Sequence, residues 1–154
     1  SPRRAEGGGS FPARRKEFGF DENDDYIMFN DDMTRESGET GYVLTKRLMT
    51  AHPEITALFV MNGIAAFGAM RALRELGYDC PRDVSVIGCD EIILSKEYIP
   101  SLTSISFDKE DYGTEIGRRI ISRMSEGTDY SGDIYVVKAK TVYRESIAAC
   151  RDKQ

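Results

Sequence analysis

Short apolar runs alternate along the chain with longer stretches in which apolar residues recur at helical spacing. The segments 57–61 and 84–88 are mostly apolar, which is typical of buried strands. Residues 102–107 alternate between apolar and polar, as a half-buried strand does. A short strand at 26–30 and a last strand at 134–142 complete the expected set.

Helices are expected between several of these strands. One runs from the capping residues Thr34, Glu36 and Ser37 to about Met49, and His52-Pro53 ends it. The next covers residues 64–76, and Gly77 suits its C-terminal cap, with Pro81 beyond it. The apolar residues that share one face of this helix are Ala66, Ala69, Met70 and Leu73.

A third helix, at 110–126, has a strong apolar stripe and stops at Gly127. The stripe consists of Tyr112, Ile116, Ile120, Ile121 and Met124. Because strands and helices alternate along the chain, the pattern predicts an α/β fold with a parallel sheet and right-handed crossovers.

Composition places the chain among ordinary globular domains. Its 154 residues suit one domain, with 40% hydrophobic and 31% charged residues. The net charge is −5, and apart from the run Arg14-Arg15-Lys16 the sequence has no basic cluster that could bind a nucleic-acid backbone. We expect no membrane span and no signal peptide, because apolar stretches of the necessary length are lacking. Three widely spaced cysteines suit a reduced, cytoplasmic compartment.

The sequence lacks the residues that several common site motifs require at fixed positions. Residues 1–12 read as a ragged start or linker, because no Gly-Lys-Ser/Thr follows the glycines at 7–9 to make a phosphate loop. The acidic run from Asp21 has Tyr26 and Asp32 where a calcium loop requires Gly and Glu. His52 is the only histidine, and no C-x-x-C occurs, so we expect neither a metal site nor redox chemistry, and no cofactor.

Asn62 and Asp90 are the strongest candidates for a binding site. Each follows an apolar run, and open α/β sheets bind ligands at the carboxyl ends of their strands. An amide and a carboxylate together donate and accept the hydrogen bonds that vicinal sugar hydroxyls need. The alternative is that the two residues only cap the turns that follow. Arg144-Glu145-Ser146, after the last strand, can form a salt-bridged edge.

The stretch from Thr56 to Ser104 resembles the effector-binding core of the lactose-repressor/galactose-repressor (LacI/GalR) family of bacterial transcription regulators. The resemblance rests on T-A-L-F-V-M-N-G-I-A-A-F-G-A-M-R-A-L-R-E-L-G-Y-D-C-P-R-D-V-S-V-I-G-C-D-E and the later Y-I-P-S-L-T-S. The segments 19–38 and 111–120 and the ending V-Y-R-E-S extend it to about 130 residues.

This chain departs from the family pattern at several positions. Gly63 replaces an Asp, Cys89 an aromatic residue and Glu91 a second Asp. The family's effector-contacting Arg corresponds to Arg14 if 17–18 stands for its Gly-Phe, and to Lys16 if 19–20 does; we prefer Arg14.

The resemblance implies a three-layer fold of the type I periplasmic-binding-protein kind, with helices on both faces of the sheet. Residues 13–107 would be the effector-binding C-terminal lobe, 108–127 a crossover helix that packs on a first lobe, and 133–147 the returning final strand. The family's first lobe and its helix-turn-helix are not in this chain. We therefore expect the 110–126 helix to project away from the sheet, to be poorly ordered, or to pack against another copy or chain.

The implied function is allosteric sensing of a small sugar or polyol, without catalysis, by a dimer that binds DNA through the missing N-terminal domain. Asn62, Asp90 and Arg14 would contact the effector, and Phe67 and Tyr98 would lie in the dimer interface. Phe67 stands apart from the apolar helix face, so a monomer is expected to expose it. The alternatives are a periplasmic sugar-binding protein of a transporter and, less favoured, a nucleotide-binding α/β enzyme, for which no G-x-G-x-x-G follows a strand.

Overall fold

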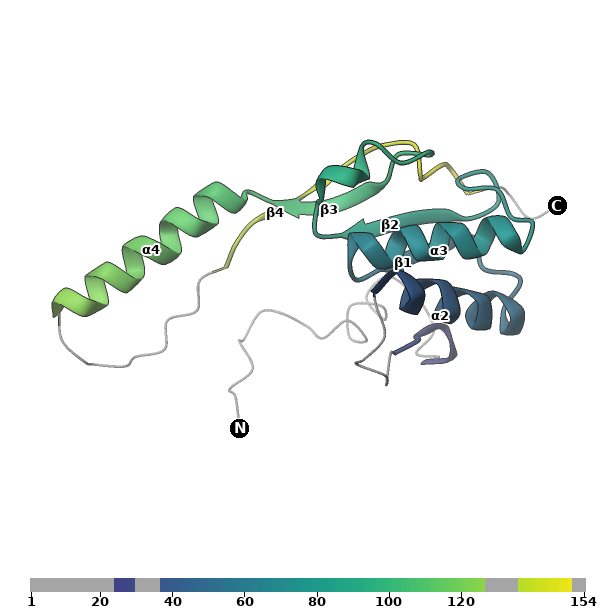
Figure 1. Ribbon diagram of the computed structural model, residues 1–154, viewed down its shortest axis with the longest axis horizontal. Helices are drawn as coiled ribbons and strands as arrows, with labels where there is room; N and C mark the ends of the chain where they lie inside the picture. The colour runs from purple at the N-terminus through teal and green to yellow at the C-terminus, as the bar shows by residue number, and fades with distance from the viewer. Residues whose placement is uncertain (1–23, 30–36, 127–135, 151–154) are drawn as a thin grey trace.

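The computed structural model of the protein describes residues 24–29, 37–126 and 136–150 (Figure 1). Most of the expected elements are present with ends shifted by a residue or two, but the last strand, expected at 134–142, begins only at Ala139, after residues 136–138 without regular structure. The expected capping residues Thr34 and Glu36 lie outside the described residues. The helices are η1 (Asp24–Tyr26), α2 (Ser37–Ala51), α3 (Gly63–Glu75), η2 (Ile93–Ser95) and α4 (Lys109–Glu126). The strands are β1 (Ala57–Val60), β2 (Ser85–Cys89), β3 (Thr103–Phe107) and β4 (Ala139–Val142). The α/β class expected from the sequence is confirmed.

The four strands form one sheet in the order β1-β2-β3-β4. β1, β2 and β3 are parallel, whereas β4 pairs antiparallel with β3. The expectation of a parallel sheet throughout is therefore wrong at its last strand. The chain leaves the carboxyl end of β3 through α4, which does not cross back over the sheet (Figure 1), so β4 returns from that same end and runs the opposite way.

The expected 26–30 strand is also wrong in its described part. Residues 24–26 form a 3₁₀ turn and residues 27–29 have no regular structure. The Tyr26 hydroxyl donates instead to Glu54, and its ring lies 4.6 Å from that of His52. These contacts hold the segment beside the turn that ends α2. His52 thus has a local structural role, next to a carboxylate 3.3 Å away.

Helix α3 forms the centre of the core. Its predicted apolar face is confirmed, because Ala66, Ala69 and Leu73 are fully buried and Met70 nearly so. The face packs on β1 and β2 together with Leu102, which lies just before β3. Gly77 follows the helix with φ +86°, a left-handed conformation that glycine adopts without strain, so the predicted C-terminal cap is confirmed.

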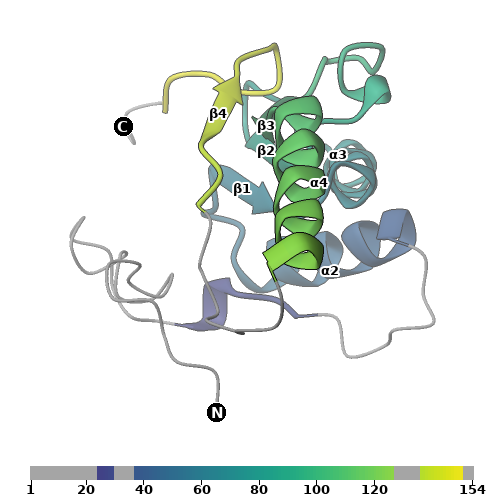
Figure 2. The same ribbon diagram turned by 90° about the vertical axis from the view of Figure 1, so that its left-hand side faces the viewer.

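Helices α2 and α3 approach so closely that only glycine fits between their backbones. A Cβ added at Gly68 would lie 1.9 Å from the carbonyl oxygen of Gly38, and one at Gly41 would lie 2.0 Å from that of Ala65. Figure 2 shows the two helices lying beside one another, and α2 also contributes Leu48 and Met49 to the core. The contact therefore depends on the absence of side chains at these positions.

Helix α4 stands apart from the sheet. Figure 1 shows it extending away from the rest of the protein, attached through the ends of β3 and β4. Asp108 caps its N-terminus by accepting hydrogen bonds from the backbone N–H groups of Glu110 and Asp111. Its apolar stripe is open to solvent: Ile120 is 54%, Ile121 67% and Met124 81% exposed. Which surface covers this stripe stays a prediction.

A polar cluster ties the exposed side of α2 to α3 and makes this contact sensitive to acid. The Glu75 carboxylate accepts from the Tyr42 hydroxyl at 2.5 Å, from Lys46 Nζ at 2.9 Å and from Arg71 Nε at 3.1 Å. The Tyr42 hydrogen bond, followed by that from Lys46, lowers the pKa of Glu75 to about 2. The carboxylate is thus ionised in the folded protein over the whole range above that value.

We expect the stability from Glu75 to be present above pH 4.5, the ordinary pKa of the group, and to disappear as the pH falls toward 2. The reason is that the unfolded chain takes up the proton first. Urea unfolding at stepped pH should show that Glu75→Gln removes part of the acid dependence. Glu97→Gln is the control, since the Glu97 carboxylate pairs with the adjacent Lys96 and does not link two helices. An unchanged acid slope in Glu75→Gln would contradict the assignment.

Candidate functional site

The sequence-predicted residues Asn62 and Asp90 lie at the carboxyl edge of the sheet. Asn62 comes two residues after β1 and Asp90 directly after β2. The two strands are neighbours and parallel, with Val60 opposite Gly88, so both residues follow strand ends on the same edge. Ligands of open α/β sheets bind at this edge. Arg14 and Lys16 lie outside the described residues.

Asn62 has a structural role that the sequence left open. Its side-chain oxygen accepts a hydrogen bond from the Ala65 backbone N–H at 2.7 Å and caps the N-terminus of α3. The capping alternative is therefore correct for the Asn62 oxygen. Its amide N–H₂ group is not used in this bond and remains a donor for a ligand.

Asp90 differs, because its side chain is exposed and its backbone has φ +63°. Among the described residues, it alone has a positive φ without being glycine. Asp and Asn tolerate this left-handed conformation better than other residues with side chains, yet it is held only where the surroundings fix it. The residues on either side of Asp90 therefore matter for the geometry of this edge.

Glu91 forms the main ion pair of the site. Arg144 donates to its carboxylate from Nη2 at 2.5 Å and from Nη1 at 3.0 Å, and the Ser104 hydroxyl donates to the same carboxylate. Arg144 Nη1 also donates to the Leu102 carbonyl at 2.7 Å. Hydrogen bonding by Arg144 lowers the pKa of Glu91 below its usual range. The sequence predicted a salt-bridged edge around Arg144, but spacing alone did not indicate the distant partner Glu91.

Ser146 joins β2 to the beginning of β3. Its backbone carbonyl accepts from the Val86 N–H at 2.8 Å, and its hydroxyl donates to the Val86 carbonyl at 2.6 Å. The same hydroxyl accepts from the Thr103 N–H at 2.8 Å. Ser146 is fully buried and fills the ladder where β3 has not yet paired with β2. The final segment thus anchors the strand that leads to the site.

Gly63, where the family pattern has an acidic residue, makes room for an apolar side chain. A Cβ at Gly63 would lie 3.1 Å from the Ile92 side chain and 3.4 Å from the Asp90 carbonyl oxygen. Ile92 thus packs against the start of α3 beside Asp90. The exposed apolar side chains of Met61 and Ile64 also flank this edge, one on either side of Asn62 and Gly63. The edge combines a few polar groups with apolar surface, as small-molecule sites do.

The predicted interface residues Phe67, in the first half of α3, and Tyr98, in the segment between η2 and β3, contact each other. The Phe67 and Tyr98 rings stack with centroids 4.6 Å apart, and both are half-buried against the core. The expectation that a monomer exposes Phe67 is therefore wrong, because Tyr98 covers it. The neighbouring Ile99 is 87% exposed.

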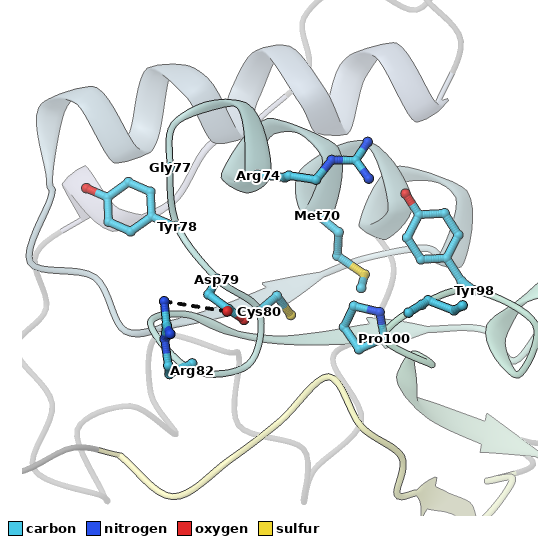
Figure 3. Close-up of a pocket in the computed structure, with 10 residues that line it drawn as sticks. Met70, Arg74, Gly77, Tyr78, Asp79, Cys80, Arg82, Tyr98 and Pro100 are labelled. Carbon is cyan, nitrogen blue, oxygen red and sulfur yellow. Dashed lines mark ion pairs between the residues drawn. The ribbon is translucent and has the colours of Figure 1, made fainter.

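A pocket of about 370 Å³ shares Tyr98 and lies before the starts of β2 and β3, at the sheet edge opposite Asn62 and Asp90. Its lining includes Met70, Arg74 and Tyr78 (Figure 3), with Arg82 paired to Asp79 at 3.5 Å. Burial raises the pKa of the Cys80 thiol there to about 11, which makes it a poor nucleophile.

Among the described residues, no three His, Cys, Asp or Glu side chains are grouped to hold a metal ion. The described helices are also too short or too polar to span a membrane.

The model of the periplasmic binding protein-like domain family matches residues 16–147. The HTH-type transcriptional repressor PurR of Haemophilus influenzae is 41% identical over 88 residues, which cover 57% of this chain and 25% of the repressor. The chain thus spans about a quarter of the length of this relative.

Solved structures agree with the family match. A sugar-binding transcriptional regulator of the LacI family from Escherichia coli, complexed with phosphate, superposes with a TM-score of 0.75 at 28% identity. That match covers 91% of this chain and 48% of the regulator. The lac repressor dimer bound to operator and the anti-inducer ONPF superposes with a TM-score of 0.64 at 32% identity, covering 73% of this chain and 38% of the repressor chain.

Proposed function

The chain belongs to the periplasmic binding protein-like domain family, and we propose that it is the effector-binding lobe of a LacI-family transcription regulator. The relatives named above are transcriptional regulators, which favours this function over delivery of a solute to a transporter. In this proposal the lobe senses a small molecule in the cytoplasm without catalysis. A separate N-terminal domain would bind DNA, since this chain has a net charge of −5.

The observation that carries the proposal is the position of Asn62 and Asp90 after two neighbouring parallel strands. The Asn62 amide donates and the exposed Asp90 carboxylate accepts, which suits a pair of sugar hydroxyls. One structural neighbour is described as a sugar-binding regulator, and this supports a sugar or polyol as effector. Arg14 is proposed as a third contact on the grounds of resemblance alone.

The exposed stripe of α4 supports the proposed two-lobe arrangement. Burial of each large apolar side chain contributes roughly 1.5–3 kcal/mol, so a stripe that includes Ile116, Ile120 and Ile121 favours a covering surface. We propose that residues 108–127 pack on a first lobe and that the effector binds between the two lobes. Both connections to α4, after β3 and before β4, then cross between the lobes.

Effector binding is tested with a named panel: glucose, galactose, ribose, lactose and cellobiose, with hypoxanthine as a different chemical class. We expect calorimetry on the whole gene product to show binding of a sugar, weakened by about 1–3 kcal/mol in Asp90→Ala, because a charged hydrogen-bond partner is lost. Asp79→Ala, at the opposite edge of the sheet, is the control. Binding of hypoxanthine alone would exclude the sugar class, and equal sugar affinity in Asp90→Ala would exclude the site.

We further propose that Phe67, Tyr98 and the exposed Ile99 lie in a homodimer interface, a role supported by the dimeric form of the lac repressor structure. A two-fold pair of such patches is self-complementary. In sedimentation of the whole gene product, Ile99→Glu should shift the monomer–dimer equilibrium toward the monomer, because the substitution places a charge in an apolar contact. Phe29→Glu is the matched control, since Phe29 is 76% exposed in the 27–29 segment, which lies beside the turn that ends α2. If only the control dissociates the dimer, the interface lies elsewhere.

A further inference from the structure

The turn formed by residues 90–92 is held on both sides of Glu91. On one side, the Glu91 carboxylate is bound by Arg144 and the Ser104 hydroxyl, and Lys109 Nζ donates to the Glu91 backbone carbonyl at 2.6 Å. On the other side, Ile92 packs against Gly63. Asp90 itself has none of these anchors, although its backbone adopts the uncommon conformation. Its geometry is therefore set by its neighbours.

Arg144 is itself fixed by groups other than Glu91. Its backbone N–H donates to Thr103 Oγ1 at 2.8 Å, and its guanidinium donates to the Leu102 carbonyl at 2.7 Å. The Arg144 and Glu91 side chains are only 16% and 24% exposed. A planar guanidinium held in this way presents two parallel donors to a carboxylate and so fixes the direction of Glu91 as well as its distance.

We propose that Glu91 and Arg144 are positioning residues that hold Asp90 in its left-handed conformation, with its carboxylate ready to accept from an effector. This rests on the proposed function of Asp90. A flexible turn would lose part of the binding free energy in ordering Asp90, whereas a preorganised one does not. The pair acts through Asp90 and does not itself contact the effector.

The backbone of Asp90 provides a test that needs no ligand. In NMR spectra of this chain, we expect Glu91→Gln to change the Asp90 amide–Hα coupling and Cα shift away from left-handed values. Arg144→Lys keeps the charge but not the two parallel donors, so it should produce a smaller change in the same signals. It replaces Glu91→Gln as the test variant if Glu91→Gln does not fold. Glu145→Gln is the control, because Glu145 bonds to Ser101 and not to the 90–92 turn. If Glu91→Gln and Arg144→Lys move Asp90 no more than this control does, the inference is overturned.

Affinity for the five sugars named above separates this inference from the proposed function. In the whole gene product, Glu91→Gln should weaken binding about tenfold, and Arg144→Lys should recover part of the loss. The effect of Glu91→Gln should vanish in an Asp90→Asn background, since the pair acts through Asp90. A full effect in that background would overturn the inference. If Asp90→Asn leaves affinity unchanged, the effector site is wrong, while the NMR result still decides whether the pair positions Asp90.

Discussion

Gly68→Ala is expected to destabilise the protein by at least about 3 kcal/mol, because the new methyl group overlaps the backbone of the neighbouring helix. Its Cβ would lie 1.9 Å from the Gly38 carbonyl oxygen and 2.9 Å from the Tyr42 nitrogen. Alanine also gains about 1 kcal/mol of helix propensity over glycine, but this gain is smaller than the cost of separating α2 from α3. The steric effect therefore decides the sign.

Thermal unfolding measures this change, and a domain of this size should lose roughly 6–12 °C in Tm. Gly113→Ala is the matched control: Gly113 is also helical, but apart from the backbone of its own helix and its chain neighbours nothing lies within 4 Å of its added Cβ, so that variant should be unchanged or slightly stabilised. A wild-type Tm for Gly68→Ala would mean that the two helices are not in backbone contact.

Ser146→Ala is expected to cost about 2–4 kcal/mol, because it leaves two buried backbone groups without their partner. The Ser146 hydroxyl donates to the Val86 carbonyl and accepts from the Thr103 N–H, and Val86, Thr103 and Ser146 are all fully buried. The loss should appear as a lower midpoint in urea unfolding with an unchanged slope.

Ser95→Ala provides the comparison for this prediction. Ser95 is also fully buried, but its hydroxyl oxygen has no hydrogen-bond partner among the described residues. Removing an unsatisfied hydroxyl is expected to be neutral or slightly stabilising. If the two variants unfold at the same urea concentration, hydrogen bonding by Ser146 does not anchor the sheet.

Gly68→Ala and Ser146→Ala both concern contacts that join segments far apart in the chain. Such contacts were the hardest to derive from the sequence. The pattern predicted the buried face of α3 and the cap at Gly77, because these depend on residues within one or two turns of each other. Sequence reasoning identified Gly68 only as part of a family pattern. Nothing in the sequence indicated that Gly68 of α3 faces the backbone of Gly38 in α2.

The site shows the same division. The sequence placed Asn62 and Asp90 after apolar runs, and the parallel pairing of β1 and β2 brings these strand ends to one edge. It did not connect Glu91 with Arg144, which are 53 residues apart, because a salt bridge between such residues leaves no periodic pattern. Nor did it exclude the capping alternative for Asn62, which required the 2.7 Å hydrogen bond to Ala65.

The sequence by itself determined the α/β class, the apolar face of α3 and the strand-end position of the candidate residues, since hydrophobic periodicity and local capping decide these. Only the tertiary structure decided that β4 runs antiparallel, that α2 contacts α3 through glycines, and that Arg144 clamps the turn beside Asp90. These features depend on where the chain goes after α4 and on which distant backbones meet. Local pattern carries no information about either, because the same amphipathic segment can pack in more than one direction.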